Sequence, residues 1–129
     1  MIITGAQISV IMFGGALGAL ARYVVSTTLM DKMGNTFPYG TLVVNIAGSF
    51  LMGFLAMLLV ERIGLDPLLR LGLFVGFLGA FTTFSTFSME TMNLFEQGNH
   101  LRALTNMLVN VLFSVLAVWL GATMGKIIG

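Results

Sequence analysis

The sequence predicts an all-α membrane protein with four transmembrane helices, because its composition excludes a water-soluble fold. Of the 129 residues, 57% are hydrophobic and only 9% are charged, whereas a typical soluble domain has about 25% charged residues. The 10 methionines and 11 phenylalanines would give a soluble chain of this length more exposed apolar surface than monomers tolerate. Both prolines and most acidic residues also fall in three short connections between long apolar segments.

Four apolar segments are long enough to cross a bilayer, which takes about 20 residues as a helix. They cover residues 6–30, 39–60, 68–95 and 101–127. Their uniform apolarity excludes the alternating strands of a membrane barrel, so we expect helices. The chain has no internal repeat, which predicts one four-span domain over residues 1–129. The first segment lacks the preceding basic residues of a signal peptide, so we expect it to be retained.

The charges in the connections give only a weak bias for the orientation in the membrane. An even number of spans places Arg62, Arg70 and Lys126 on the side of both termini and Lys32 and Arg102 on the other. Cytoplasmic connections normally hold a clear excess of Lys and Arg. The chain therefore either has one orientation set by this small bias or inserts in both, which would permit an antiparallel homodimer.

Small residues recur four positions apart on the predicted helices, and such pairs allow helix backbones to approach closely. The pairs are Gly14 with Gly18, Ser49 with Gly53, Gly72 with Gly76, and Gly121 with Gly125. The pattern leaves open whether these faces pack within one subunit or across a dimer.

Two ionisable side chains, Arg22 and Glu90, fall inside the predicted spans. An ionised group at the centre of a membrane helix costs at least about 2.5–3.5 kcal/mol, so both need partners or water. Arg22 lies late in its span and either extends to the interface or attracts an anion. Glu90 either belongs to a polar track or accepts hydrogen bonds from neighbouring hydroxyls.

Amide side chains mark the second and fourth spans. Asn45 lies in the second, while Asn106, Asn110 and Ser114 are four residues apart and share one face of the fourth. Intramembrane amides either hold helices together by hydrogen bonds or line a pathway for a polar substrate.

The third span contains the most unusual segment, because every residue from 82 to 88 carries a hydroxyl or a phenyl ring. Such a segment either stays helical, with each hydroxyl bonded back one turn, or opens. We expect a break near the middle of the membrane. Freed carbonyls there would coordinate a cation, and the N-terminus of a half-helix would favour an anion.

The polar groups of the spans suit an anion better than a cation, since amides, hydroxyls and Arg22 outnumber the single acid. Phe81, Phe84 and Phe87 are spaced by three, and the positive edges of their rings could support an anion, although phenylalanine also commonly packs against lipid. The chain has no cysteine, phosphate-binding loop or histidine pair, so we expect no enzyme activity. A net charge of +1 predicts no nucleic-acid partner.

These features together resemble the Fluc/CrcB family of fluoride channels, over essentially the whole chain. The resemblance is carried by Gly14, Gly18, Arg22 and Tyr23 in the first span, Gly40, Thr41, Asn45, Gly48, Ser49 and Phe50 in the second, and Gly76, Gly79 and residues 82–87 in the third.

The resemblance implies a dual-topology antiparallel homodimer in the bacterial plasma (inner) membrane. Its two pores would export fluoride passively from the cytoplasm and so reduce fluoride toxicity. Asn45 would donate to the anion, and Phe84 and Phe87 would turn their ring edges toward it. The other pore residues would be Thr82, Thr83, Ser85, Thr86, Glu90, Asn110, Ser114 and Arg22.

The resemblance also implies a structural Na⁺ at the centre of the dimer, held by the backbone carbonyls of Gly79 and Thr82. Many relatives carry a tyrosine in the polar stripe of the fourth span, where this chain has Asn106 and Asn110.

Two alternatives compete with this interpretation. A small four-span multidrug or cation exporter needs a carboxylate in its first span, but residues 6–30 contain Arg22 and no acid. A non-transporting assembly subunit would use the same polar residues only to join helices.

Overall fold

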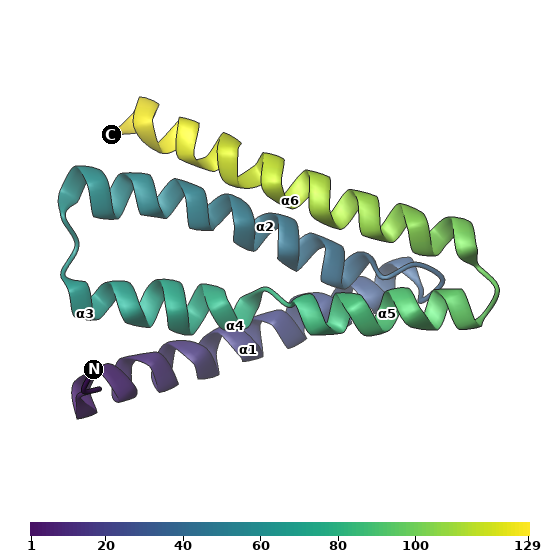
Figure 1. The fold of residues 1–129 in the computed structure, drawn as a ribbon, viewed down its shortest axis with the longest axis horizontal. Helices are drawn as coiled ribbons and strands as arrows, with labels where there is room; N and C mark the ends of the chain where they lie inside the picture. Colours follow the sequence, from purple (N-terminus) through teal and green to yellow (C-terminus); the bar gives the residue numbers. More distant parts are fainter.

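The computed structural model describes all 129 residues, which form four long helical rods joined by short connections (Figure 1). The first rod is α1 (Gly5–Met33), and the second is α2 (Tyr39–Leu55) continued by the π-helical segment η1 (Ala56–Ile63). The third combines α3 (Pro67–Arg70), the π-helical segment η2 (Leu71–Leu78), α4 (Gly79–Phe81) and α5 (Phe84–Glu96), and the fourth is α6 (His100–Ile128).

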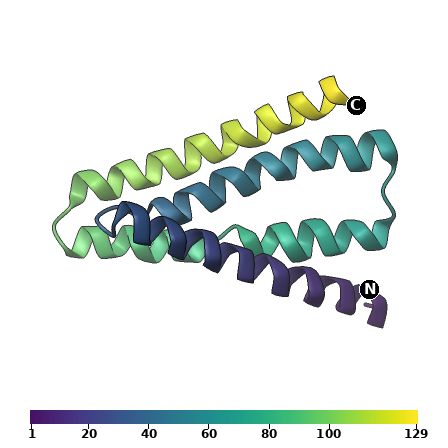
Figure 2. The same cartoon turned by 180° about the vertical axis from the view of Figure 1, so that it is seen from behind.

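All four rods are long and apolar enough to cross a membrane, which confirms the four predicted spans to within a few residues at each end. Both termini lie at the same end of the bundle (Figures 1 and 2), as an even number of spans requires. The protein is thus a multi-pass membrane protein.

Local sequence signals set the ends of the rods. Before α1, the Thr4 hydroxyl accepts from the Gln7 N–H (3.2 Å), and the Gln7 Oε1 accepts from the Thr4 N–H (3.0 Å). This reciprocal pair satisfies two N–H groups that have no helical partner. The third rod begins at Pro67, where the Asp66 carboxylate accepts from the Leu68 N–H (2.8 Å). Gly64 ends the preceding rod with φ of 74°, a conformation that favours glycine.

Glycines bring two pairs of rods into backbone contact: the first rod with the third, and the second rod with the fourth. Gly14 and Gly18 of α1 pack on the third rod, where a Cβ at Gly18 would overlap the Phe77 carbonyl. Gly53 and Gly121 hold the second rod against α6, and a Cβ at either would overlap a backbone carbonyl of the other rod. These small-residue faces therefore pack within one chain, which is the first of the two alternatives that the sequence left open.

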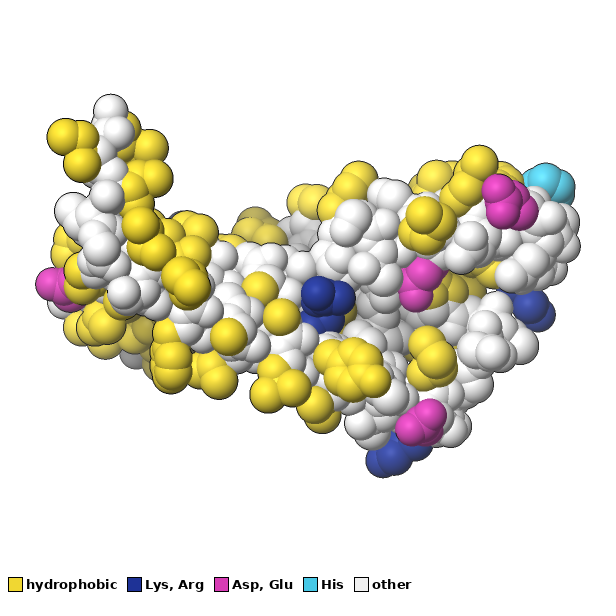
Figure 3. Space-filling view, turned by 90° about the horizontal axis from the view of Figure 1, so that it is seen from below, with side chains coloured by type: hydrophobic (Ala, Val, Ile, Leu, Met, Phe, Trp, Pro, Cys, Tyr) yellow, Lys and Arg dark blue, Asp and Glu magenta, His cyan; other side chains and the backbone are white.

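Large apolar side chains are exposed along the first, third and fourth rods, as expected for surfaces that meet lipid or another subunit. The second rod exposes only Val43 and Ile63 among its large apolar residues. Figure 3 shows one such face, with apolar side chains over most of its length and only a few charged ones.

The helical backbone of the third rod is interrupted between α4 and α5. Thr82 has φ −86° and ψ 157°, and Thr83 has φ −151° and ψ 117°, so both residues are extended. The short non-helical stretch is visible near the middle of the rod (Figure 1). Only these two residues of the hydroxyl-rich segment leave the helix, because α5 begins at Phe84.

We expect Gly18→Ala to destabilise the protein by about 1–3 kcal/mol, the range for overpacking a close contact, because the new Cβ would meet the Phe77 carbonyl. Gly15→Ala is the matched control, since its Cβ would have only the Gly76 carbonyl oxygen nearby, at 3.9 Å. Thermal unfolding in detergent would compare them. Equal loss of stability in both variants would contradict the proposed contact.

Candidate functional site

Asn45 of α2 supplies the hydrogen-bond partners of the interrupted backbone. Its Oδ1 accepts from the Thr83 N–H (2.8 Å), and its Nδ2 donates to the Thr83 carbonyl (3.1 Å). The amide thus pairs with Thr83 as a neighbouring β-strand would. Because an unsatisfied backbone group in a bilayer costs several kcal/mol, this pairing makes two extended residues tolerable inside the rod.

The Thr83 side chain starts the second half of the rod. Its hydroxyl accepts from the Thr86 N–H (3.2 Å) and donates to the Thr86 hydroxyl (3.0 Å), which is the role of an N-cap. A continuous helix would direct the Thr86 N–H to the Thr82 carbonyl and the Thr83 N–H to the Gly79 carbonyl. Both of these carbonyls have therefore lost their helical donors.

Seven of the predicted site residues line one open groove of about 370 Å³ beside the interruption. They are Asn45, Thr82, Thr83, Phe84, Phe87, Asn110 and Ser114. Gly48 lets the second rod come this close, since a Cβ there would overlap the Thr82 methyl group. The groove therefore combines amides and hydroxyls with phenyl rings.

The two phenylalanines of the groove differ in exposure. Phe84 is 74% exposed, whereas Phe87 is 6% exposed. Their ring centroids lie 5.3 Å apart with an interplanar angle of 67°, so an edge of one ring faces the other. Ring edges carry positive electrostatic potential, and the exposed Phe84 ring is free to turn an edge toward a ligand or another subunit.

Ser114 of α6 contributes a hydroxyl with no partner. Its Oγ is buried and makes no hydrogen bond, although the residue lines the groove. Buried hydroxyls usually have partners, so this O–H is available to an incoming acceptor.

Arg22 reaches into the bundle. Its Nε donates to the Ala80 carbonyl (3.0 Å), which belongs to the last turn of α4 before the interruption. The guanidinium therefore lies beside the interrupted backbone.

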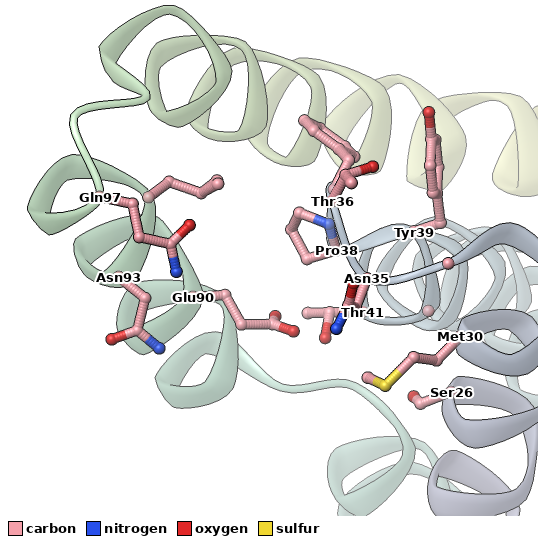
Figure 4. Close-up of a pocket in the computed structure, with 14 residues that line it drawn as sticks. Ser26, Met30, Asn35, Thr36, Pro38, Tyr39, Thr41, Glu90, Asn93 and Gln97 are labelled. Atoms are coloured by element: carbon pink, nitrogen blue, oxygen red, sulfur yellow. The ribbon is translucent and has the colours of Figure 1, made fainter.

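Glu90 lies in a separate pocket of about 160 Å³ formed by α1, α2, α5 and the first connection. Its carboxylate extends from α5 toward Thr41, and Asn93 of the same helix and Gln97, directly after its end, also line the pocket (Figure 4). One carboxylate oxygen of Glu90 is buried without a hydrogen-bond partner. The pocket and the groove share no lining residue.

The remaining predicted residues do not line the groove. Thr86 joins it through the Thr83 hydroxyl, whereas Ser85 and Gly79 are exposed and line neither the groove nor the Glu90 pocket.

Two site residues were missed by the sequence analysis. Thr41 lies beside Glu90 (Figure 4), and the buried Thr91 hydroxyl accepts from Asn106 Nδ2 (2.9 Å). Each is four residues from a predicted site residue, Thr41 from Asn45 and Thr91 from Phe87, so each shares a helix face with it. This four-residue spacing is the sequence signal that could have identified Thr41 and Thr91.

Comparison with known proteins identifies the family. Residues 9–122 match the family model described as "CrcB-like protein, Camphor Resistance (CrcB)". The chain belongs to this CrcB family. The matched residues include the groove, the interruption and the Glu90 pocket.

Several CrcB relatives have the name "Fluoride-specific ion channel FluC". One from Magnetococcus marinus is 50% identical over 122 residues, which cover 95% of this chain and 99% of the relative. One from Legionella pneumophila (strain Paris) is 47% identical over 116 residues, covering 90% and 87%. One from Methylococcus capsulatus is 51% identical over 116 residues, but the chain spans only about half of it, 51% of its length.

We expect Asn45→Leu to destabilise the protein by about 2–5 kcal/mol, because it leaves two part-buried backbone groups of Thr83 without partners. Asn93→Leu makes the same chemical change at an exposed position of α5 and should change stability little. Unfolding by denaturing detergent in mixed micelles would measure both. Similar stability of the two variants would show that Asn45 does not hold the interruption.

Proposed function

We propose that this chain is a fluoride-specific ion channel that lets fluoride leave the bacterial cytoplasm passively across the inner membrane. The observation that carries the proposal is the 50% identity to a relative of that name over 95% of this chain and 99% of the relative. The groove beside the interruption has the donors such a function needs, and the relatives' names give no support to a multidrug exporter.

Fluoride is small and strongly hydrated, so a pore must replace its water with close donors while letting the ion leave again. The Ser114 hydroxyl is an unpartnered donor, and the Asn45 amide lies in the same groove. The edges of Phe84 and Phe87 add weaker positive potential. Alternation of strong donors and ring edges suits an ion that must both enter and leave.

The other predicted residues take supporting roles in this proposal. Thr82, Thr83 and Thr86 shape the groove at the interruption, and Arg22 adds positive charge beside it. Glu90 and Ser85 belong to the approach of the ion rather than to its narrowest part, since neither lines the groove.

The functional unit of the proposal is an antiparallel homodimer with two pores. One subunit leaves the groove open and Phe84 74% exposed, so a second subunit is needed to enclose the path. An antiparallel pair requires insertion in both orientations, and the weak difference in Lys and Arg between the two sides permits this.

The proposal places the interruption at mid-membrane and a structural Na⁺ at the dimer centre, held by the carbonyls of Gly79 and Thr82. Two features support the fit: both carbonyls have lost their helical donors, and Gly79 is exposed on the single subunit, where a second subunit could reach it. Freed carbonyls of discontinuous membrane helices are suitable Na⁺ ligands.

The direct test uses purified protein in liposomes loaded with potassium fluoride, with valinomycin added to carry K⁺. We expect fluoride efflux, because the groove offers hydroxyl and amide donors that can replace the water around a small anion. A fluoride electrode would measure it. Parallel vesicles loaded with potassium chloride should release no chloride. Absence of fluoride efflux, or equal chloride efflux, would refute the proposed function.

The antiparallel arrangement has its own test, since the chain has no cysteine. Asn35→Cys places one thiol in the exposed first connection. An impermeant maleimide applied outside intact cells should label about half of the protein if the chain inserts in both orientations equally. Complete labelling, or none before membrane permeabilisation, would establish a single orientation and exclude the antiparallel dimer.

A further inference from the structure

A chain of hydrogen bonds through four polar side chains links the interruption to a deeper part of α5. Asn45 donates to Asn110 Oδ1 (3.0 Å), Asn110 donates to Asn106 Oδ1 (2.8 Å), and Asn106 donates to the Thr91 hydroxyl (2.9 Å). Thr91 in turn donates to the Phe87 carbonyl (2.8 Å). Only Asn45 and Asn110 line the groove, while Asn106 is 0% exposed and Thr91 is 6% exposed.

Backbone groups fix the direction of this chain, because an N–H can only donate and a carbonyl can only accept. The Thr83 N–H requires an oxygen from Asn45 (2.8 Å). The Asn106 carbonyl requires an N–H from Asn110 (3.0 Å). At the far end the Phe87 carbonyl takes the Thr91 O–H, so the Thr91 oxygen is left to accept from Asn106.

The donors of both groove amides are therefore in use. An asparagine amide has two N–H groups, and Asn45 gives them to the Thr83 carbonyl and to Asn110 Oδ1. Asn110 gives its own to the carbonyl and the Oδ1 of Asn106. Turning the Asn110 amide over would set its oxygen against two other oxygens. Asn110 thus presents an oxygen, and no N–H, to Asn45.

We infer that Asn110 is an internal competitor of the anion rather than one of its ligands, and that Asn106 and Thr91 are positioning residues that hold it in that role. The inference rests on the proposed function. An anion beside Asn45 must take the N–H that Asn110 accepts, since the other N–H pairs with the interrupted backbone.

This competition gives the pore a way to release its ion. A donor as strong as a free amide binds fluoride tightly and slows its exit, whereas conduction needs binding weak enough for the ion to leave. When the ion departs, the Asn45 N–H returns to Asn110 Oδ1, so no buried amide is left without a partner. The expected result of removing the competitor is tighter binding and slower conduction.

The test measures initial fluoride efflux from proteoliposomes over a range of internal fluoride concentrations. In Asn110→Leu the half-saturating fluoride concentration should fall by about three- to tenfold, the effect of removing one competing neutral hydrogen bond, and the maximal rate should also fall. If Asn110 instead donates to the ion, the half-saturating concentration will rise. A rise or no change refutes the inference.

Thr91 provides a second test that leaves the groove lining intact. Thr91→Val keeps the side-chain shape but removes the acceptor of Asn106 Nδ2. The Asn106 side chain is then no longer fixed, and Asn110 keeps only its bond to the Asn106 backbone carbonyl, so the half-saturating concentration should fall, by less than in Asn110→Leu. Thr91→Ser keeps the hydroxyl and should behave as wild type. Equal values for Val and Ser refute the positioning role, whereas a wild-type protein without fluoride flux refutes the proposed function itself.

Discussion

Inside a bilayer, each backbone N–H and carbonyl needs a partner within the protein, and the pairing of Asn45 with Thr83 meets this requirement where the third rod is interrupted. The two hydrogen bonds, at 2.8 and 3.1 Å, join residues that are 38 positions apart in the sequence. The surrounding packing serves this contact. Gly48 lets the second rod approach Thr82, and the glycine contacts between α2 and α6 bring Asn110 within hydrogen-bond distance of Asn45.

The same pairing determines which polar groups remain for an ion. It takes the Thr83 N–H away from the Gly79 carbonyl and uses one N–H of Asn45, while Asn110 uses the other. The Thr83 hydroxyl takes the Thr86 N–H away from the Thr82 carbonyl. The buried Ser114 hydroxyl remains in the groove without a hydrogen-bond partner. In the proposed channel, the interruption thus leaves two carbonyl acceptors for a central cation. The donors of the groove are few and partly occupied, so they suit an anion that passes through the pore better than one that stays bound.

The sequence was sufficient for the four spans, because their length and apolarity are local properties of the chain. It also drew attention to residues 82–88, but it did not indicate that only Thr82 and Thr83 are extended. Hydroxyls bond to their own helix as readily as to an open backbone, and Ser88 does so, donating to the Phe84 carbonyl (2.9 Å). The location of the non-helical residues depends on where Asn45 lies, which is a tertiary property.

Other features of the site depend on helix register in the same way. The bond from Arg22 to the Ala80 carbonyl joins residues 58 positions apart, so composition and spacing could not distinguish it from a side chain at the membrane interface. The sequence grouped Asn106, Asn110 and Ser114 on one face correctly. It could not show that Asn110 bonds to Asn106 and Asn45 while Ser114 has no partner, because Asn45 and Thr91, which complete these bonds, lie on other rods.

The central claim is that Thr82 and Thr83 form an extended pair held by Asn45 within the membrane. Solid-state NMR of the protein in lipid bilayers, with ¹³C and ¹⁵N labels on threonine and asparagine, would measure it directly. The account predicts extended-type backbone shifts at Thr82 and Thr83, helical shifts at Thr86, and a through-space correlation between the Asn45 amide and Thr83. Helical shifts at both residues 82 and 83 would contradict it.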